Sequence, residues 1–229
     1  MPRSRSGGAA RDGRQGLPEG PPPLLVACAL GIERFALRGG DRGGAGAPVV
    51  MLRTGMGPRA ASDAVTHALR GGSVTERAPV VATGFCAGLV AGMRPGDVVV
   101  AEAARGHLPG APDVPCSDNG PLLRALKERG VTVHTGLLRG SDHVVRGAER
   151  AGLRAQGAVA VDMESAATLE AATRDGARPV AAVRVIVDAP EHELVRIGTL
   201  RGGMSAFRVL RSILPVFFEW HRSLLLPRR

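Results

Sequence analysis

The sequence predicts an α/β fold, a three-layer α/β/α sandwich in which helices cover both faces of a central sheet. Short apolar runs alternate along the chain with segments of helical spacing. Several of these runs, such as residues 24–30, are continuously apolar, which is typical of strands buried on both faces. The chain has 229 residues, 44% apolar and 22% charged, which fits one globular domain with a substantial core.

The expected elements follow one another in a regular order. Buried strands are expected at residues 24–30, 48–52, 79–82, 98–101, 131–138, 158–161 and 180–187. Helices are expected at residues 58–70, 121–129, 148–155 and 166–173, after a strand-to-helix turn at 31–35. Pro58 is tolerated near a helix start, and Gly71 with Gly72 ends the same helix. Two segments rich in Gly or Pro, 39–46 and 105–120, are expected to be loops.

The two ends of the chain differ from its middle. Residues 1–22 hold almost nothing to bury and are predicted to be disordered, ahead of a main domain at 23–200. Residues 201–229 carry large apolar residues at helical spacing with basic flanks, which predicts a basic amphipathic helical tail. Two interpretations stay open. The tail packs on the domain or on a dimer partner, or it lies on a membrane surface with Trp220 at the interface. Pro215 is expected to break or kink the helix.

The net charge of +9 does not indicate a nucleic-acid partner. The 30 Lys and Arg residues include one lysine, Lys127, so the arginine excess is typical of codon bias in a GC-rich genome. Tyr is absent and aromatics are 3%, so stacking platforms for single strands are lacking. Three widely spaced cysteines predict reduced thiols in a cytoplasmic protein. No apolar run reaches the roughly 18 residues of a membrane span, and the histidines lack metal-ligand spacing, so no metal is expected.

Two groups of carboxylates stand at the ends of expected strands. Asp162 and Glu164 lie in the stretch 161–165, between an apolar run and a helical run. Asp188 follows the apolar strand 180–187. Because ligands bind outside the carboxyl ends of strands in open α/β sheets, we expect these side chains to face one pocket.

Four segments in order resemble the nucleoside phosphorylase and nucleosidase superfamily. They are Arg53-Thr54-Gly55-Met56-Gly57; Ala82 to Leu89 with Pro95 to Val99; Val161-Asp162-Met163-Glu164-Ser165; and Val183 to Asp188. The resemblance implies a mixed central sheet and cleavage of an N-ribosidic bond. The short length and the basic apolar tail are most similar to the hopanoid-associated phosphorylase branch, thought to remove adenine from adenosylhopane.

The resemblance implies roles for four residues. Asp188 matches the acid near the purine N7, where burial would favour its protonated form. Glu33 matches the carboxylate beside the attacking water, Glu164 matches the group that binds the ribose hydroxyls, and Met163 would pack on the sugar. Plainer interpretations stay open: a turn or N-cap aspartate, a surface glutamate, and a first-turn glutamate at the helix dipole.

The remaining candidates are backbone sites and a loop. Thr54, Gly55 and Gly57 lie at a helix start suited to an anion or hydroxyl, and Arg53 could add charge for phosphate. Three residues are expected to let the backbone approach the base or sugar, or to serve close packing: Cys86, Ala87 and Gly88. Two residues occupy the region where nucleosidases of this superfamily usually place an aromatic, which this chain lacks: His143 and Val144.

These patterns predict an enzyme, a nucleoside phosphorylase or N-ribosyl hydrolase acting on a purine nucleoside. The leading substrate is adenosylhopane, attacked by phosphate or water. The alternatives are a nucleosidase for soluble methylthioadenosine or adenosylhomocysteine, and a non-catalytic nucleoside-binding accessory protein. No cofactor is expected, with inorganic phosphate as a candidate co-substrate. The superfamily implies a homodimer, and the tail allows peripheral contact with the inner face of the membrane.

Overall fold

The computed structural model describes residues 20–71, 73–190 and 199–226. Most of the predicted disordered segment, residues 1–19, lies outside these ranges. Within them, no helix is both long enough and apolar enough to cross a membrane.

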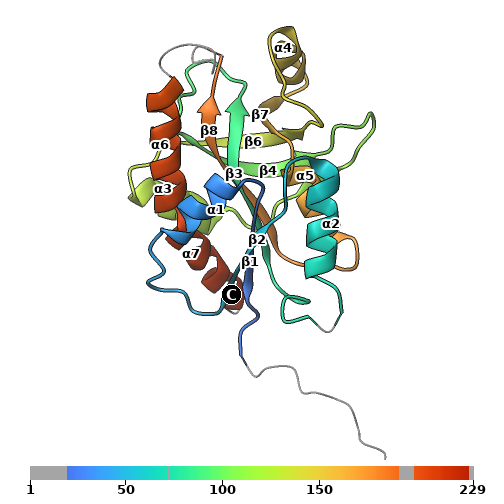
Figure 1. The fold of residues 1–229 in the computed structure, drawn as a ribbon, viewed down its shortest axis with the longest axis vertical. Coiled ribbons are helices and arrows are strands. Elements are labelled where there is room, and N and C mark those ends of the chain that lie inside the picture. The colour runs from blue at the N-terminus through green and yellow to red at the C-terminus, as the bar shows by residue number, and fades with distance from the viewer. Residues whose placement is uncertain (1–19, 72, 191–198, 227–229) are drawn as a thin grey trace, which may run out of the picture.

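Strands and helices alternate through most of the chain, as the sequence predicts (Figure 1). The strands are β1 Leu24–Cys28, β2 Val49–Arg53, β3 Val80–Gly88, β4 Val98–Arg105, β5 Asp113–Pro115, β6 Val133–Gly140, β7 Ala158–Asp162 and β8 Val180–Asp188. The helices are α1 Gly31–Arg38, α2 Pro58–Ala68, α3 Gly120–Glu128, α4 Ala148–Ala155, α5 Ser165–Thr173, α6 Thr199–Ser212 and α7 Leu214–Leu225.

The central sheet is mixed, which confirms the predicted fold class. β2, β1, β3 and β8 pair in parallel, and β8 then pairs antiparallel with β4. β4, β6 and β7 are parallel neighbours, and β7 returns to β3 in an antiparallel pair. The pairings β3-β8-β4-β6-β7 therefore close on themselves. This closure sets Ala87 of β3 opposite Val161 of β7, so the ends of β3, β7 and β8 meet.

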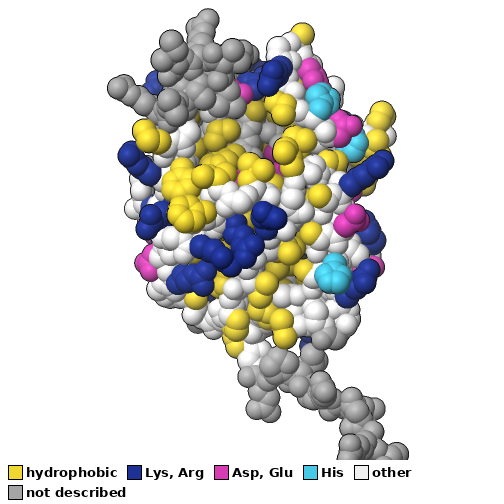
Figure 2. Space-filling view, viewed as in Figure 1, with side chains coloured by type: hydrophobic (Ala, Val, Ile, Leu, Met, Phe, Trp, Pro, Cys, Tyr) yellow, Lys and Arg dark blue, Asp and Glu magenta, His cyan; other side chains and the backbone are white. Residues whose placement is uncertain are grey.

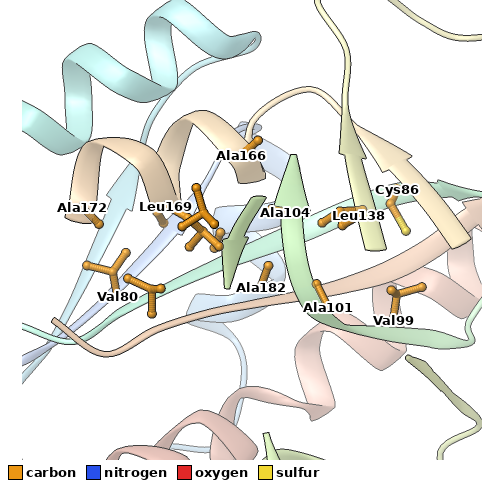
Figure 3. Packing of buried hydrophobic residues seen from close by; sticks show 14 of the residues in the cluster. Val80, Cys86, Val99, Ala101, Ala104, Leu138, Ala166, Leu169, Ala172 and Ala182 are labelled. Atoms are coloured by element: carbon orange, nitrogen blue, oxygen red, sulfur yellow. The ribbon is translucent and has the colours of Figure 1, made fainter. Parts of the chain in front are cut away.

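Helices cover both faces of the sheet. α1, α3, α6 and α7 pack on one face, and α2 with α5 packs on the other (Figure 1). On the second face, Leu169 and Ala172 of α5 point toward Val80 and Ala182 of the sheet (Figure 3). The abundance of alanine in this cluster lets the helix lie close to the strands.

The C-terminal helices belong to the core of the domain. α6 ends at Ser212 and α7 begins at Leu214, with Pro215 in the first turn, so the predicted break is confirmed. Phe217 and Trp220 are fully buried, and the Trp220 indole Nε1 donates to the Asp118 carbonyl at 3.0 Å. The tail thus packs on the domain. Trp220 belongs to the buried core cluster, contrary to the interpretation that places it at a membrane interface.

Two segments differ from the sequence-based expectation. The predicted loop 105–120 contains β5, which pairs with β4. The third strand, expected at 79–82, continues to Gly88 because β8 pairs with it along this length. The strand propensity of Gly84 is low, and the pairing with β8 overrides it.

Candidate active site

The ends of β3, β7 and β8 line one cavity of about 180 Å³, together with α1, the start of α4 and the loop after β6. The predicted site residues that line it are Glu33, Cys86, Ala87, His143, Val144, Met163, Glu164 and Asp188. The two strand ends therefore face one pocket, as expected. The cavity is also lined by Ala29, Leu30, Met56, Phe85, Val145, Arg150, Val161, Asp162 and Val187, which the sequence-based site does not include.

A buried arginine holds the base of this site together. The Arg184 guanidinium contacts Asp162 at 2.6 Å, with Glu164 further away at 3.9 Å. Arg184 Nε donates to Ser165 Oγ at 2.8 Å, and Nη1 donates to the Thr83 carbonyl at 2.9 Å. The side chains of Arg184 and Asp162 are each 1% exposed. Asp162 is therefore a structural support for the β7–α5 turn, as the sequence suggests.

The charges in this cluster shift two ionisation equilibria. Burial lowers the pKa of Arg184, but the carboxylates of Asp162, Glu164 and Glu33 raise it above its ordinary value. Burial is the main reason that the pKa of Glu164 is raised, with Arg184 opposing the shift and Asp162 adding to it. Glu164 is thus a carboxylate at the cavity wall whose negative charge is only partly compensated.

Gly84 allows Glu33 and Arg184 to approach the same point of β3. Its φ is +134°, a region that L side chains rarely adopt. A Cβ there would lie 2.4 Å from Glu33 Oε1 and 2.6 Å from Arg184 Nη1. The glycine therefore provides the room in which these two charged groups meet the strand.

Glu33 is fixed by the backbone around it. Oε2 accepts from the amides of Ala29 and Leu30 at 2.9 and 2.8 Å, and Oε1 accepts from the Phe85 amide at 2.7 Å. The residue is 2% exposed, so it is not the surface glutamate of the plainer interpretation. Oε2 thus accepts two hydrogen bonds, whereas Oε1 accepts one and keeps a second lone pair. This arrangement is compatible with the predicted role of Glu33, a carboxylate beside the attacking water molecule.

Asp188 at the end of β8 forms an ion pair with Arg150 of α4. Both side chains are 8% exposed. Arg150 also donates from Nε to the Val145 carbonyl at 3.1 Å, which ties α4 to the loop before it. The prediction placed an isolated buried acid here, but a guanidinium stands beside it and offsets the cost of burying its negative charge.

His143 lies at the rim of the cavity, held by carboxylates on both sides. Its Nδ1 lies 2.7 Å from Asp142 Oδ1, and its Nε2 lies 3.0 Å from Glu149 Oε2 in the first turn of α4. Hydrogen bonds accepted by Asp142 and then by Glu149 raise the pKa of His143. The neighbouring Val144 is 59% exposed, so this loop presents one imidazole and one apolar side chain to the rim.

Several predicted binding residues do not line the cavity. The Gly57 amide was expected to bind an anion, but it donates to Glu164 Oε1 at 2.9 Å. The Thr54 hydroxyl is buried and donates to the carbonyls of Cys28 and Gly55. Arg53 is exposed at the end of β2. The predicted phosphate contacts at these residues therefore have no counterpart in the cavity wall.

The sequence allows Gly88 either to let the backbone approach a ligand or to serve close packing, and the structure gives it the packing role. A Cβ at this position would lie 2.8 Å from Met93 Sδ and 3.2 Å from Ile186 Cδ1. Neither neighbour lines the cavity. The need for glycine here comes from strand packing, whereas Cys86 and Ala87 do line the cavity.

Arg184 and Arg150 are the charged residues that the sequence-based site missed. Arg184 has a recognisable signal, since it is a lone charge in the apolar run 180–187 and buried charges require partners. Arg150 has none, because α4 is rich in arginine and only the folded chain shows which one turns inward. Among the described residues, no three His, Cys, Asp or Glu side chains are grouped to hold a metal ion.

The comparisons with known proteins agree with this architecture. The sequence model of the Phosphorylase superfamily matches residues 35–214. The chain belongs to the Phosphorylase superfamily. This match confirms the predicted superfamily of nucleoside phosphorylases and nucleosidases and the enzyme class. Glu33 lies just outside the matched residues. No curated protein sequence gives a significant match.

Solved structures of the superfamily share the fold at low identity. The 5'-methylthioadenosine/S-adenosylhomocysteine nucleosidase of Neisseria meningitidis, in complex with methylthio-immucillin-A, is 21% identical with a TM-score of 0.69, covering 88% of this chain and 99% of its own. The enzyme of Colwellia psychrerythraea, in complex with adenine, is also 21% identical with a TM-score of 0.69, covering 88% and 96%. That of S. pneumoniae is 18% identical with a TM-score of 0.68, covering 88% and 99%.

Proposed function

We propose that the protein hydrolyses the N-ribosidic bond of an adenine nucleoside that carries an apolar group at its 5' carbon. The observation that carries this proposal is the acidic wall of the cavity. Four carboxylates line it, those of Glu33, Asp162, Glu164 and Asp188, of which Asp162 is paired with Arg184 and Asp188 with Arg150. Negative charge fixed around a sugar stabilises the positive charge that develops on the ribosyl group as the bond breaks.

Glu164 and Glu33 take the sugar side of this reaction. Glu164 is placed to accept hydrogen bonds from ribose hydroxyls, because one of its oxygens is fixed by the Gly57 amide. Glu33, fixed by three backbone amides, is placed to orient a water molecule and to accept its proton. Asp188 and Arg150 remain for the base at the other side of the cavity.

The acidic wall also favours water over phosphate as the nucleophile. A phosphate dianion would meet the carboxylates of Glu33 and Glu164, and the Gly57 amide expected to bind it already donates to Glu164. Arg53, the cation expected to support phosphate, is exposed and does not line the cavity. We therefore expect hydrolysis, with inorganic phosphate as neither substrate nor cofactor.

Release of adenine tests the proposal directly. The purified protein is incubated with methylthioadenosine, adenosylhomocysteine and adenosine, each with and without phosphate, and adenine is followed by liquid chromatography. We expect adenine release at the same rate in both buffers, with free ribosyl product. Release only with phosphate would contradict the choice of nucleophile, and no release from any nucleoside would contradict the proposed substrate class. The named activity of the structural neighbours supports the soluble substrates.

A second candidate substrate is a lipid-linked nucleoside such as adenosylhopane. A groove of about 660 Å³ adjoins the cavity and shares Phe85 and Val187 with it. Its other lining residues are Ile32, Gly203, Met204, Phe207, Arg208 and Arg211. Figure 2 shows hydrophobic side chains gathered on the side of the molecule where α1 and α6 lie, beside a group of Lys and Arg side chains. An apolar group on the 5' carbon could extend along this surface.

The lipid-linked candidate predicts behaviour at membranes that the soluble candidate does not. We expect adenine release from adenosylhopane in anionic vesicles, and co-sedimentation of the protein with these vesicles that falls on Phe207→Ser. Activity on soluble nucleosides alone would favour the methylthioadenosine class. A cytoplasmic homodimer remains our expectation for either substrate, and light scattering after gel filtration measures it.

A further inference from the structure

One surface of the domain exposes large apolar side chains beside arginines. Phe35 of α1 is 70% exposed and Ile32 is 55% exposed, while Met204 of α6 is 51% exposed. The ring centroids of Phe35 and Phe207 lie 6.2 Å apart, which joins the apolar residues of the two helices into one patch. Figure 2 shows hydrophobic side chains next to a group of Lys and Arg side chains on this side of the molecule. Contiguous exposed apolar patches with a polar rim mark interaction surfaces.

The exposed charges on these two helices are positive. Arg38 follows Phe35 by three residues, and Arg208 follows Met204 by four, so each exposed arginine shares a strip of its helix with an exposed apolar residue. Glu33 is the one acidic residue in the sequence of α1 and α6, and it is buried on backbone amides. The two helices therefore form a surface of apolar and cationic side chains. This surface, called the α1–α6 face, consists of Ile32, Phe35, Arg38, Met204, Phe207 and Arg208.

We propose that the α1–α6 face binds the surface of an anionic lipid bilayer, with Ile32, Phe35 and Met204 entering the headgroup region and the arginines contacting anionic headgroups. This inference deepens the proposed function by naming a partner of the same site, and it rests on that function only for what the cavity does. Helices bind bilayers in this way when they combine buried apolar area with attraction of basic residues to anionic lipids. The net charge of +9 favours the approach of the whole chain to such a surface.

A second copy of this chain fits the same face poorly. A two-fold contact would place the α1–α6 face against itself, because such contacts use the same surface of both copies. Arg38 and Arg208 would then meet arginines, and neither helix pair exposes a carboxylate to compensate them. Anionic headgroups supply this negative charge in a continuous plane. Charge complementarity therefore selects the bilayer as the occupant of the face.

The position of the face beside the cavity gives this contact a function. The groove that Met204, Phe207 and Arg208 help to line shares Phe85 and Val187 with the cavity. When the α1–α6 face lies on a bilayer, this groove opens at the lipid surface. An apolar 5' group of a nucleoside then passes from lipid to groove without exposing its apolar area to bulk water. The contact therefore favours lipid-linked nucleosides and leaves soluble nucleosides unaffected.

Sedimentation with vesicles tests the inference on the full chain, in the absence of any nucleoside. The vesicles consist of phosphatidylcholine alone or of phosphatidylcholine mixed with phosphatidylglycerol. We expect binding to the mixed vesicles that weakens as salt is added, because ions screen the attraction. Phe35→Ser should weaken this binding roughly tenfold. The double variant Arg38→Gln with Arg208→Gln should weaken it roughly tenfold to thirtyfold. Absence of binding to the mixed vesicles, or equal binding to phosphatidylcholine alone, would overturn the inference.

The matched controls lie in the segment between α2 and β3, outside the α1–α6 face. Val74→Ser removes an apolar side chain that is 73% exposed. Arg70→Gln with Arg77→Gln removes two exposed arginines, so its net charge equals that of the double variant on the face. Both controls should bind the mixed vesicles as the wild type does. Losses as large as those of the test variants would show that net charge or general apolar exposure explains the binding, against the inference.

Phe35→Trp reports where the bilayer contacts the protein. Trp220 is the one tryptophan of the chain and is fully buried, so its emission provides a constant background. We expect the emission of Phe35→Trp to shift to shorter wavelength when mixed vesicles are added, with no shift in the wild type. Binding without this shift would place the contact on another surface. A larger mass for the wild type than for Phe35→Ser in light scattering without vesicles would show that a second copy covers the face. Either result would overturn the inference.

The vesicle test is independent of turnover. Absence of nucleoside cleavage would overturn the proposed function and leave bilayer binding standing, whereas adenine release without vesicle binding would do the reverse. Where both hold, Phe35→Ser should lower adenine release from a lipid-linked nucleoside in vesicles and leave release from soluble nucleosides unchanged, because Phe35 lines neither the cavity nor the groove. Should Phe35→Ser fail to fold, the double arginine variant and Phe35→Trp decide.

Discussion

The Gly57 amide donates to Glu164 Oε1 across 107 residues of sequence, at 2.9 Å. This bond joins the turn before α2 to the turn between β7 and α5. It fixes one carboxylate oxygen and leaves the other toward Arg184 and the cavity. A carboxylate held in this way loses little conformational freedom when it binds a sugar, which is the value of a pre-organised site.

Glu164→Gln should separate catalysis from folding. The amide oxygen can still accept from the Gly57 amide, but the negative charge opposite the ribosyl cation is lost. We expect kcat/KM for adenine release to fall roughly 10²- to 10³-fold, with an unchanged circular dichroism spectrum. Glu170→Gln, on α5 but outside the cavity lining, is the matched control and should retain full activity. A variant at 164 with wild-type activity would contradict the sugar-binding role.

The same substitution should change stability in a pH-dependent way. Burial raises the pKa of Glu164 above its ordinary value of 4.5. Between that value and the raised one, the folded state binds more protons than the unfolded state, so stability falls as pH rises. The cost is therefore present at neutral pH and absent below pH 4.5. We expect Glu164→Gln to have a higher Tm than the wild type at pH 7, with the difference shrinking toward pH 4. A difference that grows in acid would have the wrong sign.

The sequence predicts the layers of this fold because its apolar runs are continuous. Residues 24–28 and 98–101 are fully buried, and such continuous apolar runs are visible without any structure. The break at Pro215 is equally local, since proline cannot continue a helix interior. The closed ring of strand pairings, β3-β8-β4-β6-β7, has no such local signal in the sequence. It depends on which strands become neighbours, and no periodicity records that.

The same division applies to the site. Asp188 and Glu164 were predictable because carboxylates at strand ends are conspicuous, and the structure places both in one cavity. The hydrogen bond from the Gly57 amide to Glu164 was not predictable. From the sequence alone, the start of this helix resembles a free anion site, and only the folded chain brings Glu164 to it. Arg150 could not be told from its helical neighbours, since only tertiary packing buries one of them.

Gly84→Ala should destabilise the domain more than an ordinary glycine substitution. The new Cβ would adopt an unfavourable φ and would also meet Glu33 Oε1 at 2.4 Å. We expect a loss of roughly 2–5 kcal/mol in the free energy of unfolding. Gly92→Ala is the control, because Gly92 has a φ of +84° but open space around it, so only the backbone cost of about 1–2 kcal/mol applies. Equal losses in urea titrations would exclude the clash.

The three cysteines should be unreactive in the folded protein. Burial raises the pKa of the Cys28 thiol to about 12 and that of Cys116 to about 11, and it also raises the pKa of Cys86. The thiolate is the nucleophile, and at pH 8 these groups are almost entirely protonated. We expect no labelling by iodoacetamide in the native state and three labels in urea, counted by mass spectrometry. Rapid native labelling of Cys86, which lines the cavity, would show that the site opens.

Arg184→Met should be among the most destabilising substitutions in the chain. It leaves Asp162 and Glu164 buried without their cation, and breaking such a pair costs about 3–5 kcal/mol. Removing the charge of Asp162 as well relieves part of the cost, so the double variant Asp162→Asn with Arg184→Met should be more stable than Arg184→Met alone. Urea unfolding of both variants measures the coupling. If the second substitution adds a further loss, the ion pair is not what Arg184 contributes, and its hydrogen bonds to Ser165 and Thr83 carry the stability instead.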